Sequence, residues 1–366
     1  MIYRRLLTLL ISIGLAPSLY AASPIKIAIV SSYHSEYIWT AETQSGLLKS
    51  LYEHKYLVNK SDGGTFTKNN YLKTDKVILQ KWWLDSKRKS TLPEMQKEVT
   101  RIIGDLNNFA PDIVLTGDDN ATNYIGNYYI DSETPLVFWG VNGSPMKYGL
   151  LDSLNKPGRN ITGVYQADYL KECIIFLKNL LPNIKTITIL SDDSVSSRAK
   201  IKKLRRLSSS GELHLELVTT IVTNNLNQWK TQALDAAKYT DAFFMLNHNT
   251  LKDATGRPAN NMEIGAWYLR NINKPEISYE EHFIVEGMLA AVSDSGVKQG
   301  YQAMELAIQI LAGEDPGKIA VTAPSRGDYV VNKERAKMLG IYHSIKSNTK
   351  IEAWIDHALA LKQYPE

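Results

Sequence analysis

The chain has 366 residues, a formal net charge of +4 and a single cysteine. A charge this close to neutral argues against nucleic acid or another polyanion as a partner. One thiol excludes an internal disulfide, so stability has to come from buried apolar side chains, and the length favours two lobes over one core. Cys173 shares a helical face with Leu170, Ile174 and Leu177, which predicts a place in the core.

Residues 1–21, MIYRRLLTLLISIGLAPSLYA, have the order of a secretory signal peptide. Arg4 and Arg5 come first, an apolar run over 6–15 follows, and Pro17 and the small Ala21 close the segment. The apolar run is shorter than the about 20 residues that cross a membrane, although an uncleaved anchor is the alternative. Cleavage removes two arginines and no acid and lowers the net charge from +4 to +2. The sequence therefore predicts an exported, periplasmic protein.

Short β-branched runs alternate with amphipathic stretches along most of the remaining chain. The expected strands are 25–30, 76–82, 112–115, 135–139, 186–190, 213–221, 242–246 and 276–279. The expected helices are 40–53, 92–108, 119–127, 168–181, 195–208, 225–238 and 260–271. Several strands are apolar throughout, which is typical of strands covered on both faces. This order predicts an α/β protein with parallel sheets and right-handed crossovers.

The alternation breaks at residues 140–164, which are rich in Gly, Pro, Asn and Ser and which we interpret as the passage between two lobes. After residue 279 come a long helical pattern over 296–314, two short strands at 317–323 and 328–332, and a terminal helix. The expected units are an N-terminal lobe of 23–145 plus about 296–345, a C-terminal lobe of 160–290, and a C-terminal helix within 346–366. A chain that leaves one lobe and returns crosses more than once, and such a hinge lets the lobes close on a ligand.

Polar and aromatic side chains gather directly after the strand candidates, most densely in SSYHSEYIWT at residues 31–40. In open parallel sheets, ligands bind beyond the carboxyl ends of the strands. Helix starts attract a carboxylate, Asp118, Asp119, Asp192 or Glu280 could take an ammonium group, and aromatic rings supply apolar walls or a cation–π face. For each Asp, Ser or Asn at a helix start, simple N-capping is the alternative.

Known enzyme signatures are missing from the sequence. It contains no G-x-S-x-G, no H-E-x-x-H, no G-x-G-x-x-G after a strand and no phosphate-binding loop. The seven histidines include no pair at metal-ligand spacing, and nothing beside the two Asp-Asp pairs completes a cation site. We therefore expect a protein that is not an enzyme and that needs neither a cofactor nor a metal.

Eight segments in order resemble the ABC-transporter substrate-binding protein family that includes the tryptophan- and phenylalanine-binding-like members. They are IKIAIV, SSYHSEYIWT, WWLDSKR, PDIVLTGDDNA, PLVFWGVNG, NITGVYQ, ITILSDDSVSSRA and GYQAMELAIQILAGEDPGKIAV. The resemblance runs from about residue 25 to 341. It implies a type I periplasmic-binding-protein fold: two Rossmann-like lobes, a hinge with three crossings, and a ligand enclosed between the lobes. The polar stretch 54–76 departs from the family as a longer insert.

By position, the resemblance implies ligand-facing residues in both lobes. In the first lobe these are Ser32, Tyr33, His34, Asp118, Asp119, Asn120 and Asn142. In the second lobe they are Asp192, Asp193, Asn247 and Tyr279. Trp39 joins this set because it is one of the aromatic residues that follow the first strand.

The preferred hypothesis is a solute-binding protein that closes around an amino acid or similar polar small molecule and delivers it to the membrane permease of an ABC importer. The S-Y-H…Y-x-W-T form also resembles relatives tied to sensor kinases, so a ligand-sensing protein that feeds a membrane kinase or cyclase is an alternative. A further alternative is an exported hydrolase that uses Asp118, Asp119 and either His34 or His248.

Overall fold

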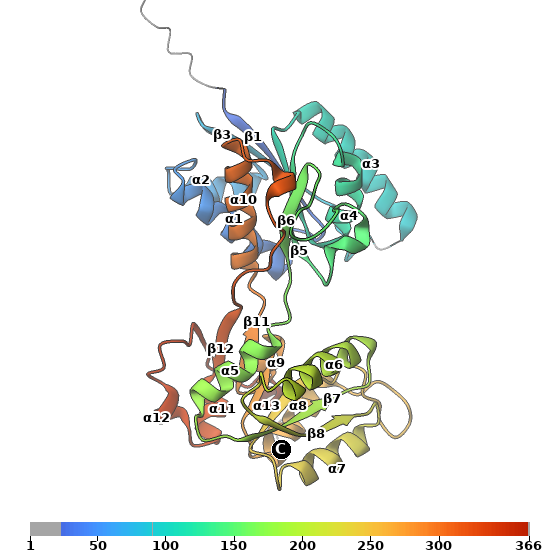
Figure 1. Cartoon of the computed structure of the whole chain (residues 1–366), viewed down its shortest axis with the longest axis vertical. Helices are drawn as coiled ribbons and strands as arrows, with labels where there is room; N and C mark the ends of the chain where they lie inside the picture. Colours follow the sequence, from blue (N-terminus) through green and yellow to red (C-terminus); the bar gives the residue numbers. More distant parts are fainter. Residues whose placement is uncertain (1–22, 90, 365–366) are drawn as a thin grey trace, which may run out of the picture.

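The computed structural model describes residues 23–89 and 91–364 and shows two α/β lobes joined by a narrow waist (Figure 1). The expected signal peptide, residues 1–21, lies outside the described residues. Within the described part of the chain, no helix combines the length and the apolar composition needed to cross a membrane.

The first lobe is built on a six-stranded sheet in the order β2-β3-β1-β4-β5-β6. Neighbouring strands are parallel except for the pair β2–β3. The strands are β1 (Ile25–Ser31), β2 (Tyr71–Lys73), β3 (Val77–Trp83), β4 (Ile113–Gly117), β5 (Leu136–Val141) and β6 (Ile161–Tyr165). The expected insert at 54–76 therefore contains an edge strand, β2, and the helix that precedes it.

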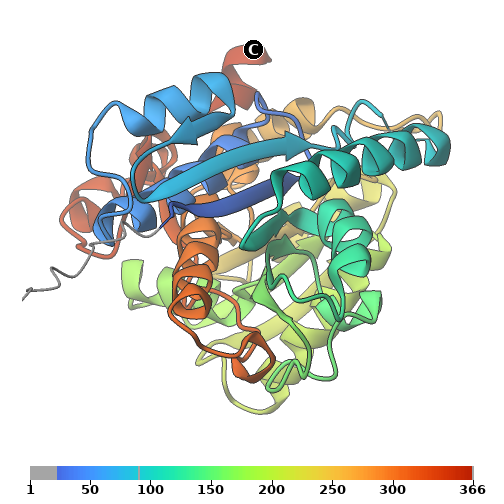
Figure 2. The same ribbon diagram turned by 90° about the horizontal axis from the view of Figure 1, so that it is seen from above.

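Helices cover both faces of this sheet because alternate side chains of each buried strand point to opposite sides. In β1, Ile27 and Ile29 pack into one apolar cluster, and Ala28 and Val30 pack into another. Viewed from above in Figure 2, the helices of the two faces lie on either side of the strands. One face carries α1 (Ile38–Glu53), α2 (Asp62–Asn69) and α10 (Gly296–Leu311), and the other carries α3 (Leu92–Phe109) and α4 (Asp118–Tyr129).

The second lobe is built on a seven-stranded sheet in the order β13-β12-β11-β10-β9-β7-β8, in which only the pair β11–β12 is antiparallel. Its strands are β7 (Thr186–Ser191), β8 (Glu216–Val222), β9 (Ala242–Asn247), β10 (Glu276–Ser278), β11 (Ala290–Ser293), β12 (Asp328–Asn332) and β13 (Ala353–Ile355). One face carries α5 (Leu170–Leu180), α6 (Val195–Ser209), α11 (Lys333–Met338) and α12 (Tyr342–Ile345). The other face carries α7 (Leu226–Ala236), α8 (Asn261–Asn271), α9 (His282–Glu286) and α13 (Leu359–Gln363). Cys173 is fully buried on α5, as predicted.

The chain passes between the lobes three times, at residues 166–169, 293–295 and 323–327. Two mostly parallel sheets and this multi-crossing hinge confirm the predicted fold class. The crossings lie at the carboxyl ends of β6 and β11 and before the amino end of β12, so the hinge adjoins the strand ends of both sheets.

The lobe boundaries differ from those expected in two places. The range 160–290 is expected in the second lobe, but β6 pairs with β5 and completes the first sheet. The range 296–345 is expected in the first lobe, but β12 pairs with β11 and lies with α11 in the second. Apolar periodicity identifies a strand and does not identify its partner, because pairing is a long-range contact.

Two further expectations at the end of the chain are wrong in detail. Residues 317–323 form a short 3₁₀ helix, Pro316–Lys318, and one isolated bridge between Val164 and Thr322 instead of a strand. The expected terminal helix near 346–366 is interrupted, because Trp354 and its neighbours extend the second sheet as β13, and within the described residues 346–364 only α13 is helical.

Candidate functional site

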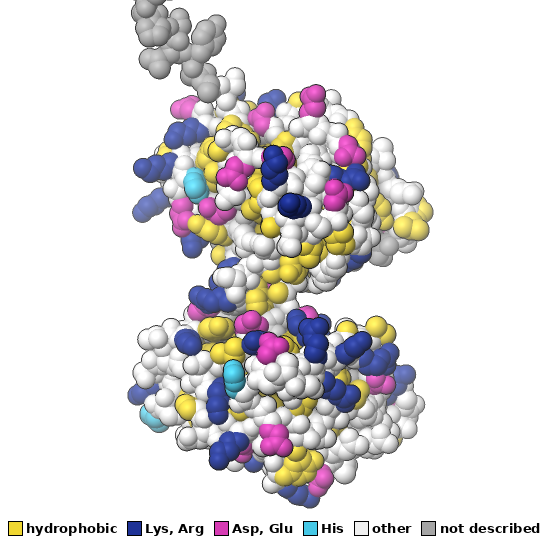
Figure 3. All heavy atoms as spheres, viewed as in Figure 1, with side chains coloured by type: hydrophobic (Ala, Val, Ile, Leu, Met, Phe, Trp, Pro, Cys, Tyr) yellow, Lys and Arg dark blue, Asp and Glu magenta, His cyan; other side chains and the backbone are white. Residues whose placement is uncertain are grey.

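A cleft of about 1090 Å³ lies between the two lobes. Its first wall comes from the loop after β1, the start of α1, the start of α4 and the residues after β5. Its second wall comes from the start of α6 and the segment from β10 to α9, and the crossings Gln166–Asp168 and Ser293–Asp294 also line it. In Figure 3 the surface is hollowed between the lobes, and hydrophobic side chains gather there on the visible face.

Six of the residues expected to face a ligand line this cleft. They are Tyr33, His34, Trp39, Asp118, Asn142 and Tyr279. All six follow a strand of one of the two sheets, which is where an open parallel sheet presents its ligand site.

Asp118 is the most deeply buried of these groups, with 3% of its surface exposed. It begins α4 with a φ of 65°, a left-handed conformation that aspartate tolerates better than most residues. The indole Nε1 of Trp39 donates to its Oδ1 at 2.8 Å. Burial raises the pKa of Asp118 to about 8; the Trp39 bond and Lys87 oppose this rise and Asp119 adds to it.

Gly140 provides the space for the Asp118 carboxylate. A Cβ atom at this position would lie 2.7 Å from Oδ1, and its φ of +70° is strained for any L side chain. The end of β5 is therefore shaped around the carboxylate.

Aromatic rings line both walls, and two of them already hold a cation. Lys87 Nζ lies 4.6 Å from the centre of the Tyr33 ring, and Lys200 Nζ lies 4.8 Å from the centre of the Tyr279 ring. Tyr33 also packs edge-on against Tyr37 at 4.9 Å. These faces suit a flat apolar body or an organic cation.

The cleft is strongly acidic. Its carboxyl groups belong to Glu36, Glu42, Asp118, Asp168, Glu280, Glu281 and Asp294. Three of them form ion pairs: Glu36–Arg88 at 3.3 Å, Asp168–Lys200 at 3.3 Å and Glu280–His282 at 2.9 Å. The other four have no ion-pair partner within the described ranges 23–89 and 91–364.

Two of these acidic groups carry further signs of an unsatisfied site. Asp294 Oδ1 is buried without a hydrogen-bond partner among the described residues. Burial raises the pKa of Asp294 to about 7. Burial, together with repulsion from Glu281 and Asp328, raises the pKa of Glu42.

The sequence prediction missed much of the second wall and the base of the cleft. The missed lining residues with polar chains include Glu42, Gln166, Asp168, Lys200, Glu281 and Asp294. Asp294 does follow a strand, so the strand-end rule could have selected it. Glu42 and Lys200 lie one turn inside their helices and gave no such signal.

Three residues of the first lobe that were predicted to face the ligand do not line the cleft: Ser32, Asn120 and Asp119. Ser32 is buried, and its Oγ donates to Gly117 O at 2.7 Å and accepts from Ala121 N at 2.8 Å. Asn120 lies in the first turn of α4 and is also absent from the cleft lining.

Asp119 faces away toward the segment after β5. It accepts hydrogen bonds from Lys147 Nζ at 2.8 Å, from Asn142 Nδ2 at 2.8 Å and from the Tyr148 hydroxyl at 2.5 Å. Burial works to raise its pKa, but these hydrogen bonds outweigh burial and hold the pKa below its usual range. The negative charge of its carboxylate is therefore already balanced by the ammonium group of Lys147.

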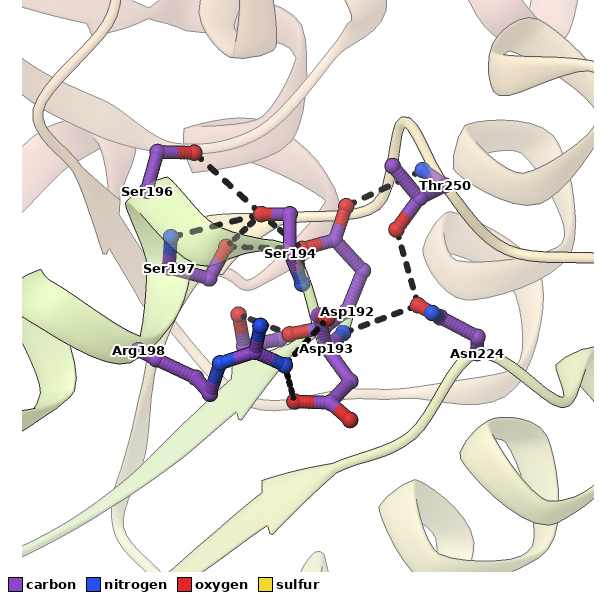
Figure 4. Close-up of polar contacts among 9 residues, drawn as sticks. Asp192, Asp193, Ser194, Ser196, Ser197, Arg198, Asn224 and Thr250 are labelled. Carbon is purple, nitrogen blue, oxygen red and sulfur yellow. Dashed lines mark hydrogen bonds and ion pairs between the residues drawn. The ribbon is translucent and has the colours of Figure 1, made fainter.

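Asp192 organises the start of α6, as Figure 4 shows. Its Oδ1 accepts from the hydroxyls of Ser194 at 2.8 Å and Ser197 at 2.7 Å, and Oδ2 accepts from Thr250 N at 3.0 Å. Burial would raise the pKa of Asp192, but these hydrogen bonds lower it below the usual value. Asp192 therefore fits the alternative in which an aspartate at a helix start serves the helix and does not face a ligand.

Asp193 and Asn247 also have local partners. Asp193 pairs with Arg198 at 2.8 Å, and Asn247 Oδ1 accepts from the backbone N–H of His248 at 2.8 Å. Neither side chain lines the cleft.

Of the groups of the hydrolase alternative, Asp118 and His34 line the cleft, whereas Asp119 and His248 do not. His248 is fully buried beside Glu286, with 3.1 Å between Nε2 and Oε2, and Asp119 is held by Lys147. His34 pairs with Asp85 at 3.2 Å. Among the residues that the structure describes, no group of three His, Cys, Asp or Glu side chains could hold a metal ion.

Comparison with known proteins gives the same picture of the fold. Residues 87–349 match the family model for ABC transporter substrate binding proteins. A curated tyrosine-binding protein of Clostridioides difficile strain R20291 is 25% identical over 226 residues, which span 61% of this chain and 62% of that protein.

Solved structures resemble the chain over nearly its whole length. The ligand-free, open structure of a substrate-binding protein with adhesive properties from Clostridium difficile has a TM-score of 0.69 at 20% identity and covers 91% of this chain and 99% of its own. An ABC domain in complex with L-Trp from Streptococcus pneumonia has a TM-score of 0.53 at 20% identity and covers 91% and 100% of the two chains.

Proposed function

Because this chain belongs to the ABC transporter substrate-binding protein family, we propose that it closes its two lobes around one small solute and delivers that solute to a membrane importer. The proposal includes export by the segment 1–21, a periplasmic location, and a binding role without catalysis.

One observation carries the proposal: the inter-lobe cleft is lined by polar and aromatic side chains from both lobes. Tyr33 and Asp118 come from the first wall, and Tyr279 and Glu280 come from the second. A solute that contacts both walls binds the closed arrangement better than the open one and shifts the population toward closure. The three-crossing hinge allows that movement without unfolding either lobe.

The contents of the cleft suit a small organic solute with an aromatic or apolar body and an amine. Tyr33 and Tyr279 offer ring faces, and Asp118 offers a buried carboxylate. The tyrosine-binding relative and the L-Trp complex support a ligand of this kind, an amino acid or a similar amine.

Delivery to a permease is preferred over signalling to a membrane kinase or cyclase. The matching family model and the ligand-free solved structure are described as substrate-binding proteins, and the curated relative as a tyrosine-binding protein. Adding the liganded protein to its cognate permease and ATPase in liposomes should stimulate ATP hydrolysis. Stimulation of a membrane kinase or cyclase instead would assign the sensing role.

Ligand binding itself is tested by a thermal-shift screen of residues 22–366 against amino acids, amines, sugars and carboxylates, followed by small-angle scattering. A ligand at a hundred times its Kd adds about 2.7 kcal/mol to the free energy of unfolding, and the radius of gyration should fall as the lobes close.

Tyr33→Ala and Tyr279→Ala should abolish the thermal shift, whereas Tyr71→Ala, on an exposed edge strand of the first lobe, serves as the matched control. A ligand that stabilises the protein equally in all three variants would place the site elsewhere. Turnover of any screened compound would instead favour the hydrolase.

A further inference from the structure

We propose that the cleft selects a small organic cation, a molecule that carries an ammonium or guanidinium group and no free carboxylate. This inference rests on the proposed function and narrows its ligand to one chemical class. It separates this chain from a receptor for zwitterionic amino acids.

The first support is the balance of charge in the cleft. Glu42, Asp118, Glu281 and Asp294 line it without an ion-pair partner among the described residues. The only lysine of the lining, Lys200, is paired with Asp168 at 3.3 Å. Lys87, outside the lining, also acts on Asp118. Four carboxyl groups against these two lysines still favour a cation over an anion between the lobes.

The second support is the geometry of Asp118. Its side chain is 97% buried yet lines the cleft, and its one hydrogen bond within the described chain comes from Trp39 to Oδ1. The other oxygen, Oδ2, accepts no hydrogen bond from the described residues. Oδ2 is not one of the fully buried oxygens that lack a partner, so it is open to the cleft, where it offers a free acceptor to an ammonium group.

The third support is the lack, in the described lining, of an arginine that could receive a ligand carboxylate. Among the described lining residues there is no arginine, the residue best suited to bind a carboxylate in two contacts. Two backbone N–H groups near the carboxyl ends of β1 and β4 are occupied, because Ser32 N donates to Gly117 O at 3.0 Å and Ala121 N donates to Ser32 Oγ at 2.8 Å, whereas the start of α1 has no side-chain cap among the described residues. The start of α4 instead carries the Asp118 carboxyl group, whose pKa of about 8 a ligand ammonium group would lower and a ligand carboxylate would raise further.

The aromatic rings complete a site for a cation. Tyr33 and Tyr279, one on each wall, already face lysine ammonium groups at 4.6 and 4.8 Å. Because Lys87 and Lys200 already lie over these rings, the rings serve as walls that pack against the body that carries the ligand cation.

The test compares molecules that share a body and differ in charge. For an aromatic body the probes are tyramine, L-tyrosine methyl ester, L-tyrosine and 3-(4-hydroxyphenyl)propanoate. For an aliphatic body the probes are agmatine and L-arginine. Isothermal titration of residues 22–366 should give, in at least one set, a Kd for the carboxylate-free cation at least tenfold lower than for the amino acid.

The outcomes separate this inference from the proposed function. Tighter binding of L-tyrosine or L-arginine than of the matching amine would overturn the cation assignment and leave the binding function intact. Tighter binding of 3-(4-hydroxyphenyl)propanoate would do the same. No binding of any probe in either set would count against both.

Substitutions in the cleft test which carboxyl groups recognise the cation. Asp118→Asn keeps the shape of the side chain and should weaken binding of the cationic probe at least tenfold, and Asp294→Asn should weaken it in the same direction. Asp105→Asn removes one negative charge from the exposed face of α3 and is the control. Equal affinity in Asp118→Asn, Asp294→Asn and Asp105→Asn would overturn the assignment, since net charge alone would then explain the preference.

Discussion

The indole Nε1 of Trp39 donates a 2.8 Å hydrogen bond to Oδ1 of Asp118 and so ties the start of α1 to the start of α4. The two residues are far apart in sequence and follow two neighbouring strands, β1 and β4, of the first sheet. The bond fixes one carboxylate oxygen and leaves the other for the cleft. We therefore propose Trp39 as a positioning residue for the candidate ligand site.

Trp39→Phe should weaken binding of tyramine about tenfold, which corresponds to about 1.4 kcal/mol. The phenyl ring retains an apolar wall, but Oδ1 of Asp118 loses its donor and the carboxylate loses its fixed orientation. Titration calorimetry measures the change in Kd. Trp354→Phe, in β13 of the second lobe, is the matched control and should bind as the unmodified protein does. A lower melting temperature with unchanged affinity would show that Trp39 only packs.

Asp118 should lower the stability of the ligand-free protein at alkaline pH. Its pKa is about 8 in the folded state and 3.8 in the ordinary carboxyl. Between these values the folded protein keeps a proton that the unfolded chain has released, so the free energy of unfolding falls as the pH rises from 3.8 to about 8. The negative charge of Asp119 and the positive charge of Lys87 both act on this carboxyl group, and Trp39 donates a hydrogen bond to it.

Asp118→Asn removes this pH dependence. At pH 9 the variant should be more stable than the unmodified protein by about 1–3 kcal/mol, because a buried, unpaired charge is gone. At pH 4 the two proteins should differ little. Urea unfolding at both pH values measures the difference, with Asp105→Asn as the control. A variant that is less stable at pH 9 would mean that the ionised carboxylate stabilises the fold.

The strand-end rule identified the part of the site that follows strands. Tyr33, Asp118 and Tyr279 were predictable because each comes directly after a buried strand, and parallel strands bring those positions to one edge. Asp192 occupies the same kind of position, but its carboxylate is used by Ser194 and Ser197. Sequence alone does not separate a capping aspartate from a ligand-facing one.

The misassigned lobe boundaries have a different physical origin. The strand 328–332 was expected as a strand, but its partner β11 lies more than 30 residues earlier in the chain. Likewise β6 sits in a segment whose Gly and Asn content favours a loop, and only pairing with β5 makes it a strand. Local sequence patterns predict whether a segment forms a helix or a strand. Long-range contacts decide which sheet a strand joins.

Gly300→Ala should destabilise the first lobe, because α1 and α10 pack closely there. A Cβ atom at Gly300 would lie 2.0 Å from the backbone oxygen of Thr43, so the helices would have to separate. We expect a loss of about 1–3 kcal/mol in the free energy of unfolding, measured by urea denaturation. Gly104→Ala, on the exposed face of α3 with nothing near its Cβ, should instead stabilise the protein by about 0.5–1 kcal/mol. Equal effects of the two substitutions would contradict the close packing.

Arg335 and Glu276 form a buried ion pair that ties α11 to β10 in the second lobe. Both side chains are at most 1% exposed, and two hydrogen bonds of 2.9 and 3.0 Å join them. Arg335 also donates to the carbonyl oxygen of Ile272 at 2.7 Å. Arg335→Met leaves the Glu276 carboxylate buried and unpaired and should cost about 3–5 kcal/mol.

Replacing both partners tests whether that cost comes from the orphaned charge. The double variant Glu276→Leu with Arg335→Met should recover part of the lost stability, because no unpaired charge remains. Arg101→Met, which removes exposed pairs on α3, should change stability by no more than about 1 kcal/mol. In Arg335→Met, hydrogen exchange should quicken in β10 and β11 and stay unchanged in β1 and β4, because α11 belongs to the second lobe. Faster exchange confined to the first sheet would contradict that placement.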